Sequence, residues 1–127
     1  MTARDLMSKR TVTLAPEMDV LRAMQTLLDE GVSGAPVVDG HGNLVGILTQ
    51  RDCLDVGLHG VYHREPAGRV RDYMKSPVQT VEATATLPEI LEAFRASRYR
   101  RFPVMEGNRL IGQISRRDTL PALLALW

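Results

Sequence analysis

The sequence predicts a mixed α/β (α+β) fold of two repeated β-α-β-β-α units, packed sheet to sheet with pseudo-twofold symmetry. The chain of 127 residues aligns with itself at an offset of 67 residues, which indicates an internal duplication. Each copy carries the same order of strand and helix signals. Each copy also has only about 50 residues, too few to bury a sufficient core alone, so the two copies are expected to pack together.

Three aligned pairs of segments carry the repeat. They are RDLM at 4–7 with RDYM at 71–74, APVV at 35–38 with FPVM at 102–105, and NLVGILTQRDCL at 43–54 with RLIGQISRRDTL at 109–120. The last pair is offset by 66 residues because the second hairpin turn is one residue shorter. The alignment predicts a first repeat at 1–58, a linker containing Gly and Pro at 59–68, and a second repeat at 69–127.

The first helix of each repeat has signals at its ends. Asp19 is a candidate N-cap for a run of apolar residues at helical spacing, and Gly31 is placed to end that helix. In the second repeat Thr86 and Glu89 match a capping box. Both segments are therefore predicted to be helices.

Strands are predicted on both sides of these helices. TVTL at 11–14 and VQTV at 78–81 are short β-branched runs. APVV and LVGIL form one predicted hairpin across the turn DGHGN, and FPVM and LIGQI form the other across EGN. Thr49 and Ser115 then begin the last helix of each repeat.

Composition limits the class of protein. Hydrophobic residues make up 44% of the chain and charged residues 24%, as in globular proteins. No apolar run reaches the roughly 18 residues of a transmembrane helix, and the first residues lack the apolar core of a secretory signal. The single Cys53 cannot form an internal disulfide. A cytoplasmic protein with no membrane partner is therefore expected.

Charge is unevenly distributed between the repeats. Residues 1–68 carry six Lys and Arg against nine Asp and Glu, whereas residues 69–127 carry ten against six. The second repeat is therefore the one expected to attract an anion.

Each repeat ends with a hydroxyl three residues ahead of a carboxylate. The pairs are Thr49 with Asp52 in GILTQRD and Ser115 with Asp118 in GQISRRD. One interpretation is a helix N-cap with an acidic residue in the first turn, which stabilises a helix by about 1 kcal/mol. The other is a nucleoside phosphate site, because a ribose diol donates to a carboxylate and a helix start attracts a phosphate. The residues alone leave both interpretations open.

Neighbouring residues match the rest of such a ligand. Pro36 and Pro103 form an apolar corner in each repeat, and Ile47 lies on the neighbouring strand, so a flat base can be accommodated. In the second repeat Arg100 and Arg101 precede the strand and can fork onto phosphate oxygens.

The ordered set of motifs resembles a tandem pair of cystathionine-β-synthase (CBS) domains, the Bateman module, from Arg4 to about Leu120. The resemblance rests on DLM and DYM, on Thr13 and Thr80, on the two PV dipeptides, and on the G-x-x-[ST]-x-x-D segment that ends each repeat. It implies a sensor of adenosine ligands such as AMP, ADP, ATP or S-adenosylmethionine, with no required cofactor and no metal. Such modules commonly form homodimers.

The resemblance also implies residue roles: Asp52 and Asp118 on ribose, Thr49 and Ser115 on ribose or phosphate, and the two arginines on phosphate. The predicted ligand set is Thr13, Ser33, Pro36, Ile47, Thr49, Asp52, Thr80, Arg100, Arg101, Pro103, Ser115 and Asp118. Ser33 and Gly34 stand where the second repeat has its arginines, so weaker binding of a charged tail is expected at the first repeat, unless Arg or Lys residues of the other repeat reach across. Gln113 stands where Ile47 is apolar, so the two sites are not expected to be equivalent.

Other patterns give weaker hypotheses. His59 and His63 are four residues apart, but a glycine interrupts the helical spacing and no third ligand follows, so a metal site is not expected. Cys53 has no local base and is expected to pack. The arginines around Tyr99 suit nucleic acid, but a nearly neutral chain with 5% aromatic residues argues against this as the main function. The apolar tail at 120–127 is either a dimer contact or packs on its own repeat.

The predicted function is a regulatory module rather than an enzyme, because no acid–base pair, activated nucleophile or metal set can be assembled from these residues. A ligand that binds one arrangement of the repeats better than another shifts the population that a separate regulated protein recognises. The alternative is an unliganded dimerisation or interaction scaffold, in which the two hydroxyl–carboxylate pairs serve only as helix caps.

Overall fold

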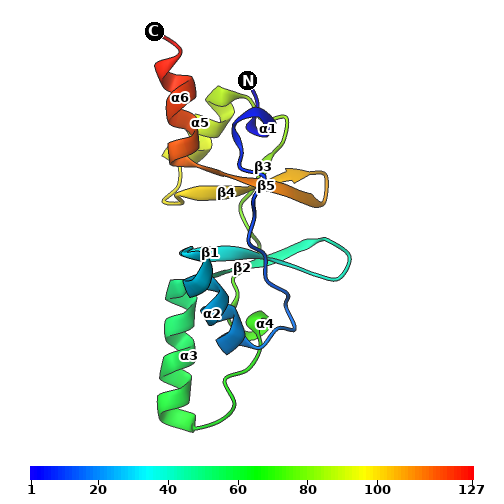
Figure 1. The fold of residues 1–127 in the computed structure, drawn as a ribbon, viewed down its shortest axis with the longest axis vertical. Helices are drawn as coiled ribbons and strands as arrows, with labels where there is room; N and C mark the ends of the chain where they lie inside the picture. Colours follow the sequence, from blue (N-terminus) through cyan, green and yellow to red (C-terminus); the bar gives the residue numbers. More distant parts are fainter. The chain divides into compact units, whose positions relative to one another are not determined.

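The computed structural model describes residues 1–127, which form two compact units (Figure 1). Residues Val12–Val78 form one, called here the first-repeat unit, and Met1–Thr11 with Gln79–Trp127 form the other, the second-repeat unit. We call residues 1–11 and 69–78 the leader segments. Each leader thus belongs to the compact unit of the other repeat, which the repeat boundaries in the sequence did not predict.

The first-repeat unit consists of helices beside a hairpin. Its elements are α2 (Val20–Glu30), β1 (Gly34–Val38), β2 (Leu44–Thr49), α3 (Gln50–His63) and α4 (Val70–Tyr73). Helices α2 and α3 lie side by side next to the antiparallel hairpin of β1 and β2 (Figure 1). Leu27 of α2, Leu48 of β2 and Val56 of α3 share one buried core.

The second-repeat unit repeats this order of helix, hairpin and helix. Its elements are α1 (Ala3–Leu6), β3 (Val81–Glu82), α5 (Leu87–Arg95), β4 (Arg101–Glu106), β5 (Arg109–Ser115) and α6 (Arg116–Leu124). The sheet order is β3-β4-β5, with β3 parallel to β4 and β5 antiparallel to it. Ile90, Phe102 and Ile114 form the centre of its core. The mixed class and the duplicated unit are confirmed.

The predicted helix ends are confirmed. Asp19 Oδ1 accepts the backbone N–H of Leu21 at 2.8 Å, and Gly31 ends α2 with a φ of 66°, a conformation that favours glycine. Thr86 and Glu89 form the capping box of α5, in which Glu89 Oε1 accepts the Thr86 N–H at 3.2 Å.

The first strand of each repeat is shorter than predicted. Of residues 11–14, only Leu14 pairs, in one parallel bridge to β1, and the strand predicted at 78–81 is found at Val81–Glu82. In the second-repeat unit Ala83 extends the pairing by donating its N–H to the Met105 carbonyl at 2.8 Å. The aligned residue of the first repeat is Pro16, which has no N–H to donate.

Helix α3 continues through His63, so the first five residues of the predicted linker at 59–68 are helical. The prediction ended this helix too early because of Gly60. A helical glycine lowers stability by about 1 kcal/mol but does not prevent a helix. With 14 residues α3 is the longest helix, and none of the helices has the length and apolar character needed to cross a bilayer.

Candidate functional site

The two hydroxyl–carboxylate pairs lie where a strand passes directly into a helix. Thr49 ends β2 and is the N-cap of α3, and Ser115 ends β5 and is the N-cap of α6. We call Thr49 with Asp52 the first site and Ser115 with Asp118 the second site. Both N-cap residues have extended backbones, with φ of −112° and −106° and ψ of 165°. The duplication therefore holds at the backbone of both sites.

In the first site, Asp52 has protein partners on both carboxylate oxygens. Its Oδ2 accepts the backbone N–H and the hydroxyl of Thr49, each at 2.9 Å. Its Oδ1 lies 3.3 Å from the Nζ of Lys75, in an ion pair with a carboxylate side chain that is only 5% exposed. The Asp52 N–H donates to Thr49 Oγ1 at 3.2 Å. The capping interpretation is confirmed here.

In the second site, Asp118 has a less complete set of partners. Its Oδ2 accepts the backbone N–H of Ser115 at 2.8 Å, and its own N–H donates to Ser115 Oγ at 3.2 Å. Asp118 is half-buried, forms no ion pair, and accepts no protein hydrogen bond at Oδ1. The cap is confirmed again, and it leaves one carboxylate oxygen available to a donor.

A loop rests against the start of each last helix. The Gln50 N–H donates to the Ser33 carbonyl at 2.8 Å, and the Arg116 N–H donates to the Arg100 carbonyl at 2.9 Å. Because these bonds are equivalent in the two units, Ser33 and Arg100 occupy corresponding places beside their sites, as the alignment predicted.

The arginines gather beside the second site. Arg100 and Arg101 are exposed and form no ion pair, so their guanidinium groups are available to an anion. Arg116 is partly fixed, because its Nε donates to the Tyr99 carbonyl at 3.1 Å. In the first repeat Ser33 and Gly34 stand in place of these two arginines. A side chain at Gly34 would crowd the neighbouring strand, with a Cβ only 3.0 Å from the Leu48 carbonyl oxygen.

The remaining predicted ligand residues are more scattered. Pro36 and Pro103 are buried in β1 and β4, where they pair with Ile47 and Gln113. Thr13 is exposed, one residue ahead of Leu14. The structure brings together the two residues of each hydroxyl–carboxylate pair.

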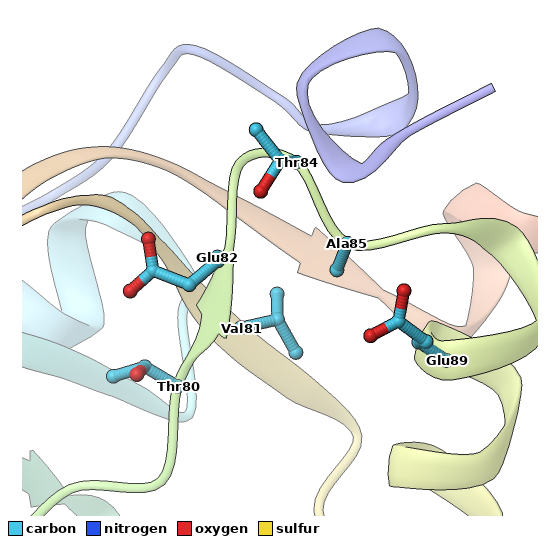
Figure 2. Close-up of a pocket in the computed structure, with 6 residues that line it drawn as sticks. All are labelled: Thr80, Val81, Glu82, Thr84, Ala85 and Glu89. Atoms are coloured by element: carbon cyan, nitrogen blue, oxygen red, sulfur yellow. The ribbon is translucent and has the colours of Figure 1, made fainter.

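Thr80 lines a pocket of about 380 Å³ in the second-repeat unit, shown in Figure 2. Its lining residues are Thr80, Val81, Glu82, Thr84, Ala85 and Glu89. Hydrogen bonds from Thr86 hold the pKa of the Glu89 carboxyl below its usual value. Two carboxylates disfavour an anionic ligand in this pocket, and Ser115 and Asp118 are not part of its lining.

Sequence reasoning missed the role of the leader segments. Lys75 exchanges two backbone hydrogen bonds with Ile47, at 2.9 and 3.0 Å, and Ser8 does the same with Gln113, at 3.0 and 2.8 Å. Each leader thereby extends the hairpin sheet of the other repeat, and in the first site it brings Lys75 to Asp52. The signal was present in the alignment, which sets a lysine opposite Ser8.

Cys53 packs as predicted, and the two histidines lie next to each other on α3. His59 and His63 stack with ring centroids 4.8 Å apart, and His59 Nε2 lies 3.6 Å from the Glu65 carboxylate. No group of three or more His, Cys, Asp or Glu side chains is arranged to hold a metal ion. Cys53 packs against the core of its unit, and burial, followed by the charge of Asp52, raises the pKa of its thiol. A raised pKa keeps the thiol protonated and unreactive.

Comparison with known proteins adds a family and its relatives. The sequence profile of the CBS domain matches residues 3–59 and 70–125. The uncharacterized protein MJ1225 of Methanocaldococcus jannaschii is 27% identical over 124 residues, which cover 98% of this chain and 43% of that protein. Inosine-5'-monophosphate dehydrogenase of the same organism is 33% identical over 119 residues, which cover 93% of this chain and 23% of the dehydrogenase. The chain thus spans less than half the length of these relatives.

Solved structures share the fold over the whole chain. The crystal structure of CBSX2 in complex with AMP has a TM-score of 0.84 and 26% identity, covering 98% of this chain and 97% of that one. The CBS domain pair of MJ0100, in complex with 5'-methylthioadenosine and S-adenosyl-L-methionine, has a TM-score of 0.78 and 20% identity, covering 100% and 98%.

Proposed function

Since this chain belongs to the CBS domain family, as a tandem pair, we propose that it is a regulatory module that binds an adenosine ligand, with AMP as the first candidate. CBSX2, which resembles it over nearly the full length of both chains, was crystallised with AMP. Catalysis is not part of the proposal, because the chain is proposed to act by changing what a separate protein recognises.

The second site is the observation on which the proposal depends. Asp118 keeps Oδ1 available while Oδ2 caps the helix, so the carboxylate can accept a ribose hydroxyl without loss of the cap. The start of α6 and the exposed Arg100 and Arg101 offer positive charge to a phosphate. A neutral sugar and an anionic group are thus matched by neighbouring residues of one unit.

Regulation follows from linkage. A ligand stabilises whichever arrangement of the protein binds it better, and a partner that prefers the same arrangement then binds more tightly by the same factor. The regulated partner is proposed to be a separate protein or a further part of a longer chain.

Homodimerisation is proposed from exposed apolar side chains. Helix α6 and the residues after it expose Leu120, Leu124, Leu126 and Trp127, with Leu124 80% and Trp127 96% exposed. These exposures count against the alternative that the tail packs on its own unit. A second apolar surface on α3 is formed by Leu54, Leu58, Val61 and Tyr62. Contiguous apolar surfaces of this kind mark protein interfaces.

The scaffold alternative has one observation in its favour. Both carboxylate oxygens of Asp52 already have partners inside the protein, as in a helix cap with no ligand. A scaffold would dimerise in the same way but would not respond to nucleotides.

Thermal unfolding with AMP, ADP, ATP, NAD and S-adenosylmethionine tests the proposal. A ligand at about 100 times its dissociation constant should raise the free energy of unfolding by roughly 2.7 kcal/mol. Asp118→Ala should remove the second-site part of this gain. Asp5→Ala is the matched control, because Asp5 caps α1 with the same geometry, its Oδ2 accepting the Thr2 N–H at 2.8 Å. No response to any of the five ligands would favour the scaffold.

A further inference from the structure

Lys75 and Ser8 occupy equivalent places in the two leader segments but differ in charge. Each exchanges two backbone hydrogen bonds with the last strand of its unit, Lys75 with Ile47 and Ser8 with Gln113. The backbone pairing at this position is therefore the same in both units, whereas the side chain that the leader places there is different.

The Lys75 side chain reaches the carboxylate of the first site. Its Nζ lies 3.3 Å from Asp52 Oδ1, and its backbone is held on β2 by the bonds to Ile47. Because the other oxygen of Asp52 is used by Thr49, the ion pair occupies the remaining acceptor. A ribose diol that donates to that oxygen therefore competes with the ammonium group.

The second site has no such barrier. The Ser8 hydroxyl is directed to the carbonyl of Arg10, at 3.5 Å, and Asp118 forms no ion pair. The two sites therefore have the same helix cap, but the carboxylate of Asp52 is paired with a lysine and the carboxylate of Asp118 is not.

We propose that Lys75 masks the first site, so that an adenosine ligand fills the second site first and enters the first only when the Lys75–Asp52 pair opens. This inference rests on the proposed function, since it assigns unequal affinities to the same two sites. The mask is partial, because the Lys75 side chain is 69% exposed and ion pairs of exposed lysines are weak.

The mask gives the first site an unusual dependence on salt. Salt screens the Lys75–Asp52 attraction, so the affinity of the first site for uncharged adenosine should rise with ionic strength. Binding of AMP at the second site should fall instead, because salt also screens the attraction between arginine and phosphate.

Isothermal titration calorimetry with adenosine tests the mask. In a chain carrying Asp118→Ala, with its fold checked by circular dichroism, only the first site remains. Adding Lys75→Ser, which copies the residue of the other leader, should tighten adenosine binding by about 2- to 5-fold. Lys9→Ser, which removes an exposed leader lysine, is the matched control and should leave the affinity unchanged. In the otherwise unaltered chain, Ser8→Lys should weaken the second site by a similar factor.

The outcomes separate the mask from the proposed function. If the parent binds adenosine or AMP, but Lys75→Ser and Ser8→Lys change neither affinity, the mask is wrong and the sensor proposal stands. A loss of AMP affinity in Lys75→Ser, with adenosine unchanged, also overturns the mask and assigns Lys75 to the phosphate. A parent chain that binds neither molecule overturns both proposals.

Discussion

Met74 lies against Gly46 so closely that a Cβ on this glycine would be 2.5 Å from the methionine Sδ. The same contact is repeated in the other unit, where a Cβ on Gly112 would be 2.7 Å from the Sδ of Met7. Methionine and glycine both belong to motifs that the sequence repeats. Their contact explains why each leader packs with the strand of the other repeat.

Gly46→Ala is therefore expected to destabilise the protein. The Lys75 carbonyl oxygen also lies 3.0 Å from the added Cβ, so the backbone of the leader has to move, and overpacking of this kind lowers the free energy of unfolding by about 1–3 kcal/mol. Gly57→Ala is the control, because nothing lies within 4 Å of that Cβ and alanine is the better helix former by about 1 kcal/mol. Urea unfolding measures the free energy of unfolding of both variants. A Gly46→Ala chain as stable as Gly57→Ala would contradict the packing described here.

The capping box of α5 predicts a pH dependence of stability. Hydrogen bonds from Thr86 lower the folded-state pKa of Glu89 below its ordinary value of 4.5. Ionised Glu89 therefore contributes stability above pH 4.5, and this contribution is lost as the pH falls through the lower folded-state value. Glu89→Gln keeps an acceptor without the charge, so parent and variant should converge in stability toward pH 3. Urea unfolding at several pH values measures this, and a constant difference would contradict the assignment.

The exposed tail predicts a dimer that a charge disrupts. Leu124→Glu should convert the dimer to a monomer, because a buried unpaired carboxylate is strongly unfavourable in an apolar interface. Leu21→Glu, on the exposed face of α2, should leave the dimer intact. Light scattering coupled to size-exclusion chromatography reports the mass. A parent chain of 14.1 kDa at all concentrations would rule out the proposed homodimer.

The arginines of the second site should distinguish the phosphate from the sugar. The double variant Arg100→Ala, Arg101→Ala is expected to bind AMP roughly tenfold or more weakly, because a hydrogen bond to a charged group usually contributes that much to affinity. Its adenosine affinity should not change. Arg109→Ala, at the exposed start of β5, is the matched control. Equal losses for AMP and adenosine would show that the arginines support the fold rather than the phosphate.

Much of the fold was readable from local signals. Asp19, Gly31 and the Thr86–Glu89 box fixed the helix ends because each acts within one turn, and the two hairpins followed from short turns between apolar runs. The strand at 11–14 was overpredicted, since only Leu14 pairs, and Pro16 has no N–H with which to extend the pairing beyond it. The helix at 59–63 was missed because one helical glycine lowers stability by about 1 kcal/mol without ending a helix.

The candidate site was only half predictable for a related reason. Thr49 and Asp52 are three residues apart, so their contact is local and the spacing revealed it. Lys75 reaches Asp52 only because residues 69–78 cross to the first-repeat unit. The spacing of residues within one repeat does not predict that a leader packs in the unit of the other repeat. The charge difference between Lys75 and Ser8 was nevertheless visible in the alignment.

We propose above all that Asp118 accepts the ribose hydroxyls of an adenosine ligand. Calorimetric titration with AMP and with 2',3'-dideoxy-AMP tests it most directly, since the two ligands differ only in the diol. The dideoxy ligand is expected to bind the second site at least about tenfold more weakly, because hydrogen bonds to a charged acceptor are lost. Equal affinities for the two ligands would contradict it.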